Sequence, residues 1–287
     1  MGNQGHSSAS TFMIREWIDS GAIGEVRRVD CWNNTSYSNR GWPKSSPPVP
    51  ETLDWDLWVG NAAFRPYNPG CIKRFYGWPD FGTGTIGAWG THTLDASFWG
   101  LQLGAPTSVE AKATSDHPAG AFPYGVMIEF NYPARGDMPP VTVAMYMGKM
   151  SADMARPKHL EAARKLAPKG GQVIIGSKAS ILAGRWCESA RIIPETKMQE
   201  IGKPPKKYDR PIGGHFGSWI NACKDGGKPA TSNFDYAGPF TEMCLLGVIA
   251  SLCPGKKLLW DSAKMKITND EEANKLVRRQ YRKGWKI

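Results

Sequence analysis

A glycine-rich stretch that leads into a histidine is the part of this sequence best suited to chemistry. Residues 84–95 read GTIGAWGTHTLD, and we expect His92 to lie where a helix begins. Glycines let the backbone approach a ligand closely, and histidine moves protons near neutral pH. Asp95 follows three residues later, so on a helix it would share a face with His92 and could orient the ring. The alternative is a capped helix with a buried, purely structural histidine.

The composition restricts the class of protein. Of the 287 residues, 41% are hydrophobic and 22% are charged, which is ordinary for a globular protein with a substantial core. No apolar run approaches the roughly 20 residues of a membrane span, and the polar first residues show no signal peptide. The formal charge of +10 permits anionic ligands. The basic clusters at 203–207 and 278–286 lack a nucleic-acid-binding motif, so we expect neither a nucleic-acid nor a membrane partner.

Cysteines and tryptophans narrow the chemistry further. The six cysteines form no C-x-x-C pair, so we expect no metal site. The twelve tryptophans have flat faces that stack well on sugar rings, although most are expected to pack in the core. Five of them crowd the segment that leads to His92, where sugar contacts would be useful: Trp42, Trp55, Trp58, Trp78 and Trp89.

The elements that must position these residues follow from hydrophobic periodicity and turn signals. Strands are predicted at 25–34, 107–114, 124–132, 141–148, 171–176, 179–183 and 190–193. Helices are predicted at 7–20, 53–59, 92–101, 212–225, 235–252 and 270–280. The proline-rich stretch 35–82 is expected to be largely irregular, and 258–268 is either strand or loop. The fold class is therefore α+β, a mostly antiparallel open sheet with helices packed on one face.

Taken together, these segments resemble the C-terminal domain of the Gfo/Idh/MocA oxidoreductases, nicotinamide-dependent enzymes that act mostly on sugars and cyclitols. The resemblance extends in order along nearly the whole chain. It is carried by MGNQGHS at 1–7, similar to the last strand of the family's Rossmann domain, IDSGAIGEV at 18–26, the glycine-rich stretch with its histidine at 82–95, KP at 228–229, DYA at 235–237, and 278–285. It implies a remnant of the dinucleotide-binding domain at 1–8 and a substrate domain at 9–287.

The resemblance also implies roles for individual residues. His92 would accept a proton from a sugar hydroxyl while the carbon gives up hydride to NAD or NADP. Gln4 and His6 would lie near the cofactor, although they could form a simple polar turn. Substrate contacts are expected from five residues, each with a surface or packing role as the alternative: Arg74, Tyr76, Trp78, Asp95 and His215.

Two departures from the family pattern, and one chance match to it, stand out. The chain has no Glu-Lys-Pro, the motif whose lysine works at the family's reacting centre. The spacing G-x-G-x-x-G occurs at Gly82, Gly84 and Gly87, but it follows a loop rather than a strand and is interpreted as a chance match. Ala88 occupies the position, one turn before His92, where family members usually have an aspartate.

These departures predict a truncated product or gene fragment that is inactive alone and binds neither NAD nor NADP tightly. Two alternatives stay open: an NAD-dependent glycoside-cleaving enzyme of the same family, and a non-catalytic sugar-binding or oligomerising module. A homo-oligomer formed through the open sheet is expected. Any export signal would precede Met1, so the cytoplasm is the default location and the periplasm stays open.

Overall fold

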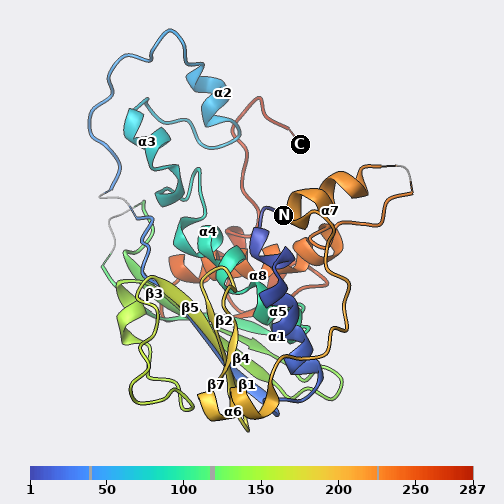
Figure 1. Cartoon of the computed structure of the whole chain (residues 1–287). Helices are drawn as coiled ribbons and strands as arrows, with labels where there is room; N and C mark the ends of the chain where they lie inside the picture. Colours follow the sequence, from blue (N-terminus) through green and yellow to red (C-terminus); the bar gives the residue numbers. More distant parts are fainter. Residues whose placement is uncertain (39–40, 117–119, 225, 287) are drawn as a thin grey trace.

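The computed structural model describes residues 1–38, 41–116, 120–224 and 226–286, and its centre is one open β-sheet (Figure 1). The strands are β1 Val26–Asn33, β2 Ser108–Thr114, β3 Gly125–Tyr132, β4 Val141–Gly148, β5 Gly170–Gly176, β6 Ser180–Gly184, β7 Arg191–Ile193, β8 Lys257–Asp261 and β9 Lys266–Ile267. Their order in the nine-stranded sheet is β7-β6-β5-β1-β4-β3-β2-β8-β9. Only the β1–β4 pairing is parallel among the described strands. The predicted α+β class with a mostly antiparallel sheet is confirmed.

Alternation along the strands separates two faces, because successive side chains of a strand point to opposite sides. In β1, Val29 and Cys31 belong to the main core beneath the helices. Trp32, on the other face, packs with Leu160 and Val173 in a smaller cluster, so the chain after β4 covers part of that second face.

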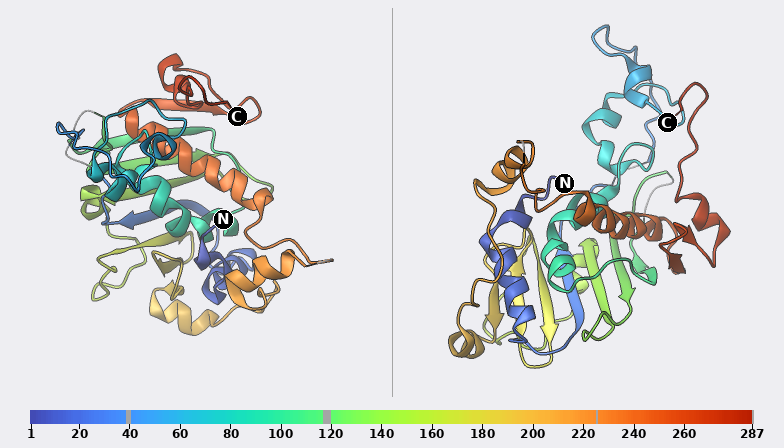
Figure 2. Two further views of the ribbon diagram at one scale, coloured as in Figure 1. Left: turned by 90° about the horizontal axis from the view of Figure 1, so that it is seen from above. Right: turned by 90° about the vertical axis from the view of Figure 1, so that its right-hand side faces the viewer.

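Four helices lie over the main core and hold the site in place (Figure 2). They are α1 Ala9–Asp19, α4 Gly84–Thr93, α5 Asp95–Gly100 and α8 Phe234–Leu252. Ser8 caps α1 by accepting a hydrogen bond from the Thr11 amide. The expected division of the chain after residue 8 stays a prediction.

The remaining elements are short. They are the helices α2 Trp55–Val59, α3 Pro69–Lys73, α6 Glu195–Ile201, α7 Gly214–Ala222 and α9 Glu271–Lys275, and the 3-10 helices η1 Gln4–Ser7, η2 Phe75–Gly77 and η3 Lys149–Asp153. Asp225, the expected end of α7, lies outside the described residues. The last helix spans five residues rather than the predicted 270–280.

The stretch 41–82 projects beyond the sheet and carries a small core of its own (Figure 2). Trp55, Tyr67 and Cys71 are buried there, and Trp42 and Trp58 pack against them. These tryptophans therefore stabilise the projection instead of offering free faces to a sugar. Near the C-terminus, the Arg282 guanidinium pairs with Asp56 at 2.7 Å and donates to the Gly60 carbonyl at 2.6 Å, which fastens the chain to α2.

The prediction of where the histidine-bearing helix starts is wrong. Helix α4 begins at Gly84, so His92 lies in its last turn, and the predicted single helix 92–101 is divided at Leu94. The glycines serve helix packing: a Cβ at Gly90 would lie 3.3 Å from Cys244 Sγ of α8. Small residues thus let α4 and α8 approach each other. From the sequence pattern alone, this glycine-rich stretch was expected to be a turn.

None of the helices within these described ranges has the length and hydropathy needed to cross a lipid bilayer.

Candidate functional site

Among the histidines that the structure describes, His92 has the surroundings that suit acid–base chemistry. Its ring is half-buried in the last turn of α4. Its Nδ1 is buried and has no hydrogen-bond partner among the residues that the structure describes. Burial lowers the pKa of His92 below its usual 6.5, the Arg185 cation lowers it further, and Asp95 opposes part of that change. The imidazole is therefore neutral near pH 7 and can accept a proton.

Aromatic and cationic side chains surround this ring. Trp89 precedes His92 by three residues, and the two ring centroids are 5.7 Å apart. Trp186, in the turn between β6 and β7, lies 5.5 Å from Trp89. The Arg185 guanidinium carbon sits 4.4 Å from the Trp89 ring centroid and 4.2 Å from that of Trp186. These four residues form a continuous group, which we call the His92 shelf.

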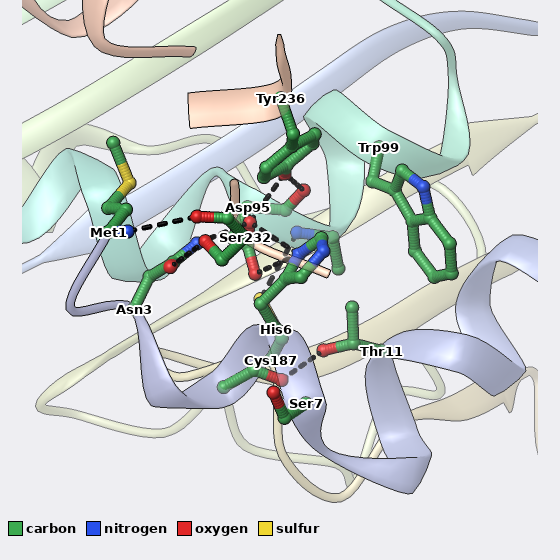
Figure 3. Close-up of polar contacts among 12 residues, drawn as sticks. Met1, Asn3, His6, Ser7, Thr11, Asp95, Trp99, Cys187, Ser232 and Tyr236 are labelled. Atoms are coloured by element: carbon green, nitrogen blue, oxygen red, sulfur yellow. Dashed lines mark hydrogen bonds and ion pairs between the residues drawn. The ribbon is translucent and has the colours of Figure 1, made fainter. Parts of the chain in front are cut away.

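Asp95 does not orient His92, contrary to the prediction from helical spacing. Its carboxylate is fully buried and accepts hydrogen bonds from Asn3 Nδ2 at 2.9 Å, from His6 Nδ1 at 3.0 and 3.1 Å, and from the Tyr236 hydroxyl (Figure 3). The break at Leu94 starts a new helix at Asp95, so the two side chains leave different helices. The carboxylate is saturated by protein donors, and its expected contact with substrate stays a prediction.

His6 is enclosed in the same cluster. It is 1% exposed, and its ring lies 4.3 Å from Tyr236 and 5.3 Å from Trp99 between centroids. In this geometry His6 fastens η1 to α5 and offers no free edge, whereas Gln4 in the same turn is exposed. Contact of Gln4 and His6 with a cofactor stays a prediction.

Gln4 and His215 are brought together, although 211 positions separate them in the sequence. Both line a cavity of about 230 Å³ beside Phe216 and Trp219 of α7. His215 Nδ1 lies 3.0 Å from Ser7 Oγ, and its Nε2 lies 2.9 Å from the Met1 carbonyl. Because both ring nitrogens are engaged, His215 presents only the face of its ring to a ligand.

Arg74, Tyr76 and Trp78 belong to a different place. Arg74 and Tyr76 line a surface hollow with Tyr37, on which the Tyr76 ring stacks at 4.9 Å. Trp78 is only 2% exposed and packs edge-on against Trp42. The Tyr76 backbone lies against Gly82, just before α4 begins. His92 is eight residues along that helix from Gly84, about 12 Å, so the structure does not unite this trio with His92.

Sequence reasoning missed the two residues of the His92 shelf that come from the β6–β7 turn. Arg185 and Trp186 stand between two short predicted strands. Arg185 and Trp186 could have been identified from their adjacent positions in a predicted hairpin, since a turn can carry two long side chains to one side of a sheet. What the sequence did not show is that this hairpin folds toward α4.

The glycines of the G-x-G-x-x-G spacing leave no room for the phosphates of a dinucleotide. A Cβ at Gly84 would lie 2.9 Å from the Phe122 ring, and one at Gly87 would lie 2.2 Å from Thr83 side-chain atoms. The space beside these glycines is filled by the protein, so they do not fit a pyrophosphate. This agrees with the interpretation of the spacing as a chance match. The described residues also contain no cluster of three or more His, Cys, Asp or Glu side chains suited to a metal ion.

Comparison with known families agrees with the fold and with the position of the histidine. Residues 11–136, which include α4 and His92, match the model of the oxidoreductase family, C-terminal alpha/beta domain, of the Gfo/Idh/MocA group. This part of the chain is thus similar to the C-terminal domain of the Gfo/Idh/MocA oxidoreductases. Comparison with curated proteins gives no match.

Similar solved structures include three oxidoreductases. An aldose-aldose oxidoreductase from Caulobacter crescentus, complexed with glycerol, has 11% identity and a TM-score of 0.49, over 90% of this chain and 63% of that one. The WlbA dehydrogenase from Bordetella pertussis, in complex with NADH and UDP-GlcNAcA, has 14% identity and a TM-score of 0.47, over 90% and 62%. An oxidoreductase from Thermotoga maritima has 13% identity and a TM-score of 0.43, over 90% and 61%. The chain therefore spans about three fifths of the length of these structures.

Proposed function

We propose that this chain is the substrate-binding domain of an NAD- or NADP-dependent oxidoreductase that acts on a sugar or cyclitol, and that His92 accepts the hydroxyl proton. The observation that carries the proposal is the state of His92, a half-buried imidazole with a buried, unpartnered Nδ1 among the described residues and a lowered pKa. Its location inside the family match supports the same role.

The chain's own contribution lies on the substrate side of the reaction. The neutral His92 ring removes the proton of the carbinol hydroxyl, a task worth roughly 10²–10⁴-fold in rate. Trp186 is 41% exposed, and its indole offers surface for a sugar ring. A bound nicotinamide cofactor would supply the redox chemistry by accepting the hydride of the carbinol carbon. Gly84 and Gly87 have no space for the phosphates of this cofactor, so other residues would have to hold them.

Two measurements test the proposal. Calorimetric titration of the 287-residue chain with NAD and with NADP should show no micromolar binding. A fusion of this chain to a nucleotide-binding domain of the same family, assayed for NADH formation with a panel of sugars and cyclitols, should lose about 10²–10⁴-fold of its rate on His92→Gln.

Two results would decide against the proposal. Micromolar NAD affinity of the chain alone contradicts a pure substrate domain. Release of free sugar from a glycoside without net NADH assigns the glycoside-cleaving alternative instead.

We also propose that two copies associate through the open face of the sheet. The polar groups on that face pair among themselves: Arg28 binds Asp30 at 2.8 Å and Glu129 at 3.0 Å, and Thr142 donates to Asn131 at 2.9 Å. Because its polar groups are already paired, this face can pack against the same face of a second copy without leaving buried charges unpaired. Light scattering should find a dimer or larger species that Thr142→Arg dissociates, and a monomeric wild-type chain would contradict this proposal.

A further inference from the structure

Among the residues that the structure describes, the guanidinium of Arg185 has no acidic partner, although it lies beside the candidate catalytic histidine. No carboxylate lies within 4.0 Å of it in the part of the chain that the structure describes. Arg28 and Arg65, each with a side chain 37% exposed, have carboxylates at 2.8 and 2.6 Å. The Arg185 guanidinium lies over the ring faces of Trp89 and Trp186. Stacking on a ring face uses the face of the guanidinium and leaves its N–H edge available.

The turn that carries Arg185 is firmly held, so the guanidinium has a defined position. Cys187 adopts a φ of +62°, a conformation that costs about 1–2 kcal/mol in a non-glycine residue. Its buried thiol offsets this through contacts with Gln172 Nε2 at 3.0 Å and with the His92 carbonyl at 3.3 Å. The turn is thereby tied to the end of α4.

Two further contacts hold the neighbouring residue. Glu188 Oε2 accepts a hydrogen bond from the Trp186 amide at 2.8 Å. Gly5 of η1 lies so close to the Trp186 carbonyl that a Cβ there would be 2.4 Å from the oxygen. The backbone that carries Arg185 and Trp186 is therefore fixed from α4, from η1 and from within the hairpin.

We propose that the His92 shelf binds an anionic sugar, with its carboxylate or phosphate on Arg185, its ring on Trp186 and a hydroxyl directed to His92. This inference rests on the proposed function of His92 and narrows its substrate to charged sugars.

The physical reason is the match between an unused cation and an anion. A guanidinium edge binds a carboxylate or phosphate through two parallel hydrogen bonds, and each charge-assisted bond is stronger than a neutral one. A neutral sugar offers hydroxyls to the same edge and leaves the charge without a counter-ion. The formal charge of +10 on the whole chain favours the approach of an anion as well.

The test is calorimetric titration of the 287-residue chain with D-glucuronate, D-glucose 6-phosphate and D-glucose at fixed ionic strength. At least one of the two anions should bind about tenfold to a hundredfold more tightly than glucose, as expected from charge-assisted hydrogen bonds. Comparison of the two anions identifies a carboxylate or a phosphate as the preferred group.

Variants locate the effect. Arg185→Gln should abolish the preference for the anion, and Arg185→Lys should keep part of it because the charge remains. Arg27→Gln is the matched control, since Arg27 is an exposed arginine on β1 that pairs with Glu25, and it should leave the preference unchanged. A folded far-ultraviolet spectrum for each variant excludes unfolding as the cause of a loss.

Several outcomes would overturn the inference: equal affinity for glucose and both anions, absence of binding by all three probes, or a preference that survives Arg185→Gln. The titration needs no cofactor, so it is independent of the oxidation assay. Anion binding without NAD-dependent turnover would refute the proposed function alone, and turnover of neutral sugars only would refute the present inference alone.

Discussion

Two histidines of this chain lie close to the same junction, between α4 and α5, and their surroundings are opposite. His6 is 1% exposed and gives its Nδ1 proton to the Asp95 carboxylate at 3.0 Å. His92 is half-buried, and its Nδ1 has no partner within the described part of the chain. Proximity to a buried carboxylate therefore does not make a histidine catalytic. The ring whose nitrogen is left free is the one that can do chemistry.

The difference follows from how the carboxylate is used. Asp95 receives donors from Asn3, His6 and Tyr236, which come from the beginning of the chain and from α8. Among the described residues, no hydrogen bond joins this carboxylate to His92. Asp95 acts on His92 only through space, where it opposes part of the pKa lowering that burial causes.

Removal of Asp95 should have the largest effect. Asp95→Ala removes the buried carboxylate that Asn3, His6 and Tyr236 share, and breaking such a buried cluster costs about 3–5 kcal/mol. His92→Ala, three residues away, should lower the free energy of unfolding by about 1 kcal/mol or less. Urea denaturation of the two variants makes the measurement, and equal losses would remove the distinction between a structural and a functional histidine.

Two buried tyrosines give a finer test of the Asp95 cluster. The Tyr236 hydroxyl donates to Asp95, whereas the Tyr132 hydroxyl is buried without a partner among the described residues. Tyr236→Phe should cost about 1.5 kcal/mol because it removes a hydrogen bond to a charged group. Tyr132→Phe is the matched control and should be neutral or slightly stabilising. Chemical denaturation distinguishes them, and the reverse order would contradict the assigned hydrogen bonds.

The pKa of His92 should lie below 6.5, because burial and the Arg185 cation both disfavour the imidazolium. The pKa of His92 is thus lower in the folded chain than in the unfolded chain. The contribution of neutral His92 to the free energy of unfolding is therefore fully present above the unfolded pKa, and it is lost as the pH falls through the folded pKa. Histidine NMR titration measures this, with the resonance assigned by its loss in His92→Ala. Arg185→Gln should raise the pKa of His92, and a value above 6.5 in the wild-type chain would contradict a desolvated ring.

The smallest effect is expected at Ala88, one turn before His92. An aspartate there would face His92 at the i, i+4 spacing of a helix and would favour its protonated form. Ala88→Asp should therefore raise the pKa of His92, and Ala88→Asn, which has the same shape without the charge, should leave it near the wild-type value. An equal pKa of His92 in the two variants would mean that a charge at position 88 does not act on the imidazole ring.

The sequence predicted much of the fold because the strands are alternating or continuous apolar runs bounded by turn residues. Each predicted strand from 25–34 to 190–193 is present within about two residues, and the long helix at 235–252 is confirmed. The start of α4 was not predictable in the same way. Gly84, Gly87 and Gly90 have low helix propensity, and the packing of Gly90 against Cys244 of α8 is a tertiary contact that the sequence does not show.

The site was less predictable than the fold. His92 stands out as a residue type, but its shelf depends on how a hairpin at 184–190 folds against α4, a contact across more than 90 positions. The pairing of Asp95 with His92 failed because local spacing cannot show that a carboxylate is already occupied by Asn3, His6 and Tyr236. Nothing in the sequence pattern indicates those partners, which are brought together only by tertiary structure.

The Asp95 cluster also has a consequence for how the chain acquires its structure. Its hydrogen bonds join residues separated by 92, 89 and 141 positions, and the Ser232 hydroxyl that supports Asn3 is 229 positions away. Contacts of such long range must overcome loop-closure entropy, and they form late. Asn3 and Asp95 therefore lack the support of Ser232 and Tyr236 during synthesis until the beginning of α8 has emerged. A ribosome that stalls between residues 95 and 232 would hold a chain in which Asn3 and His6 can bind Asp95 but the rest of the cluster is missing.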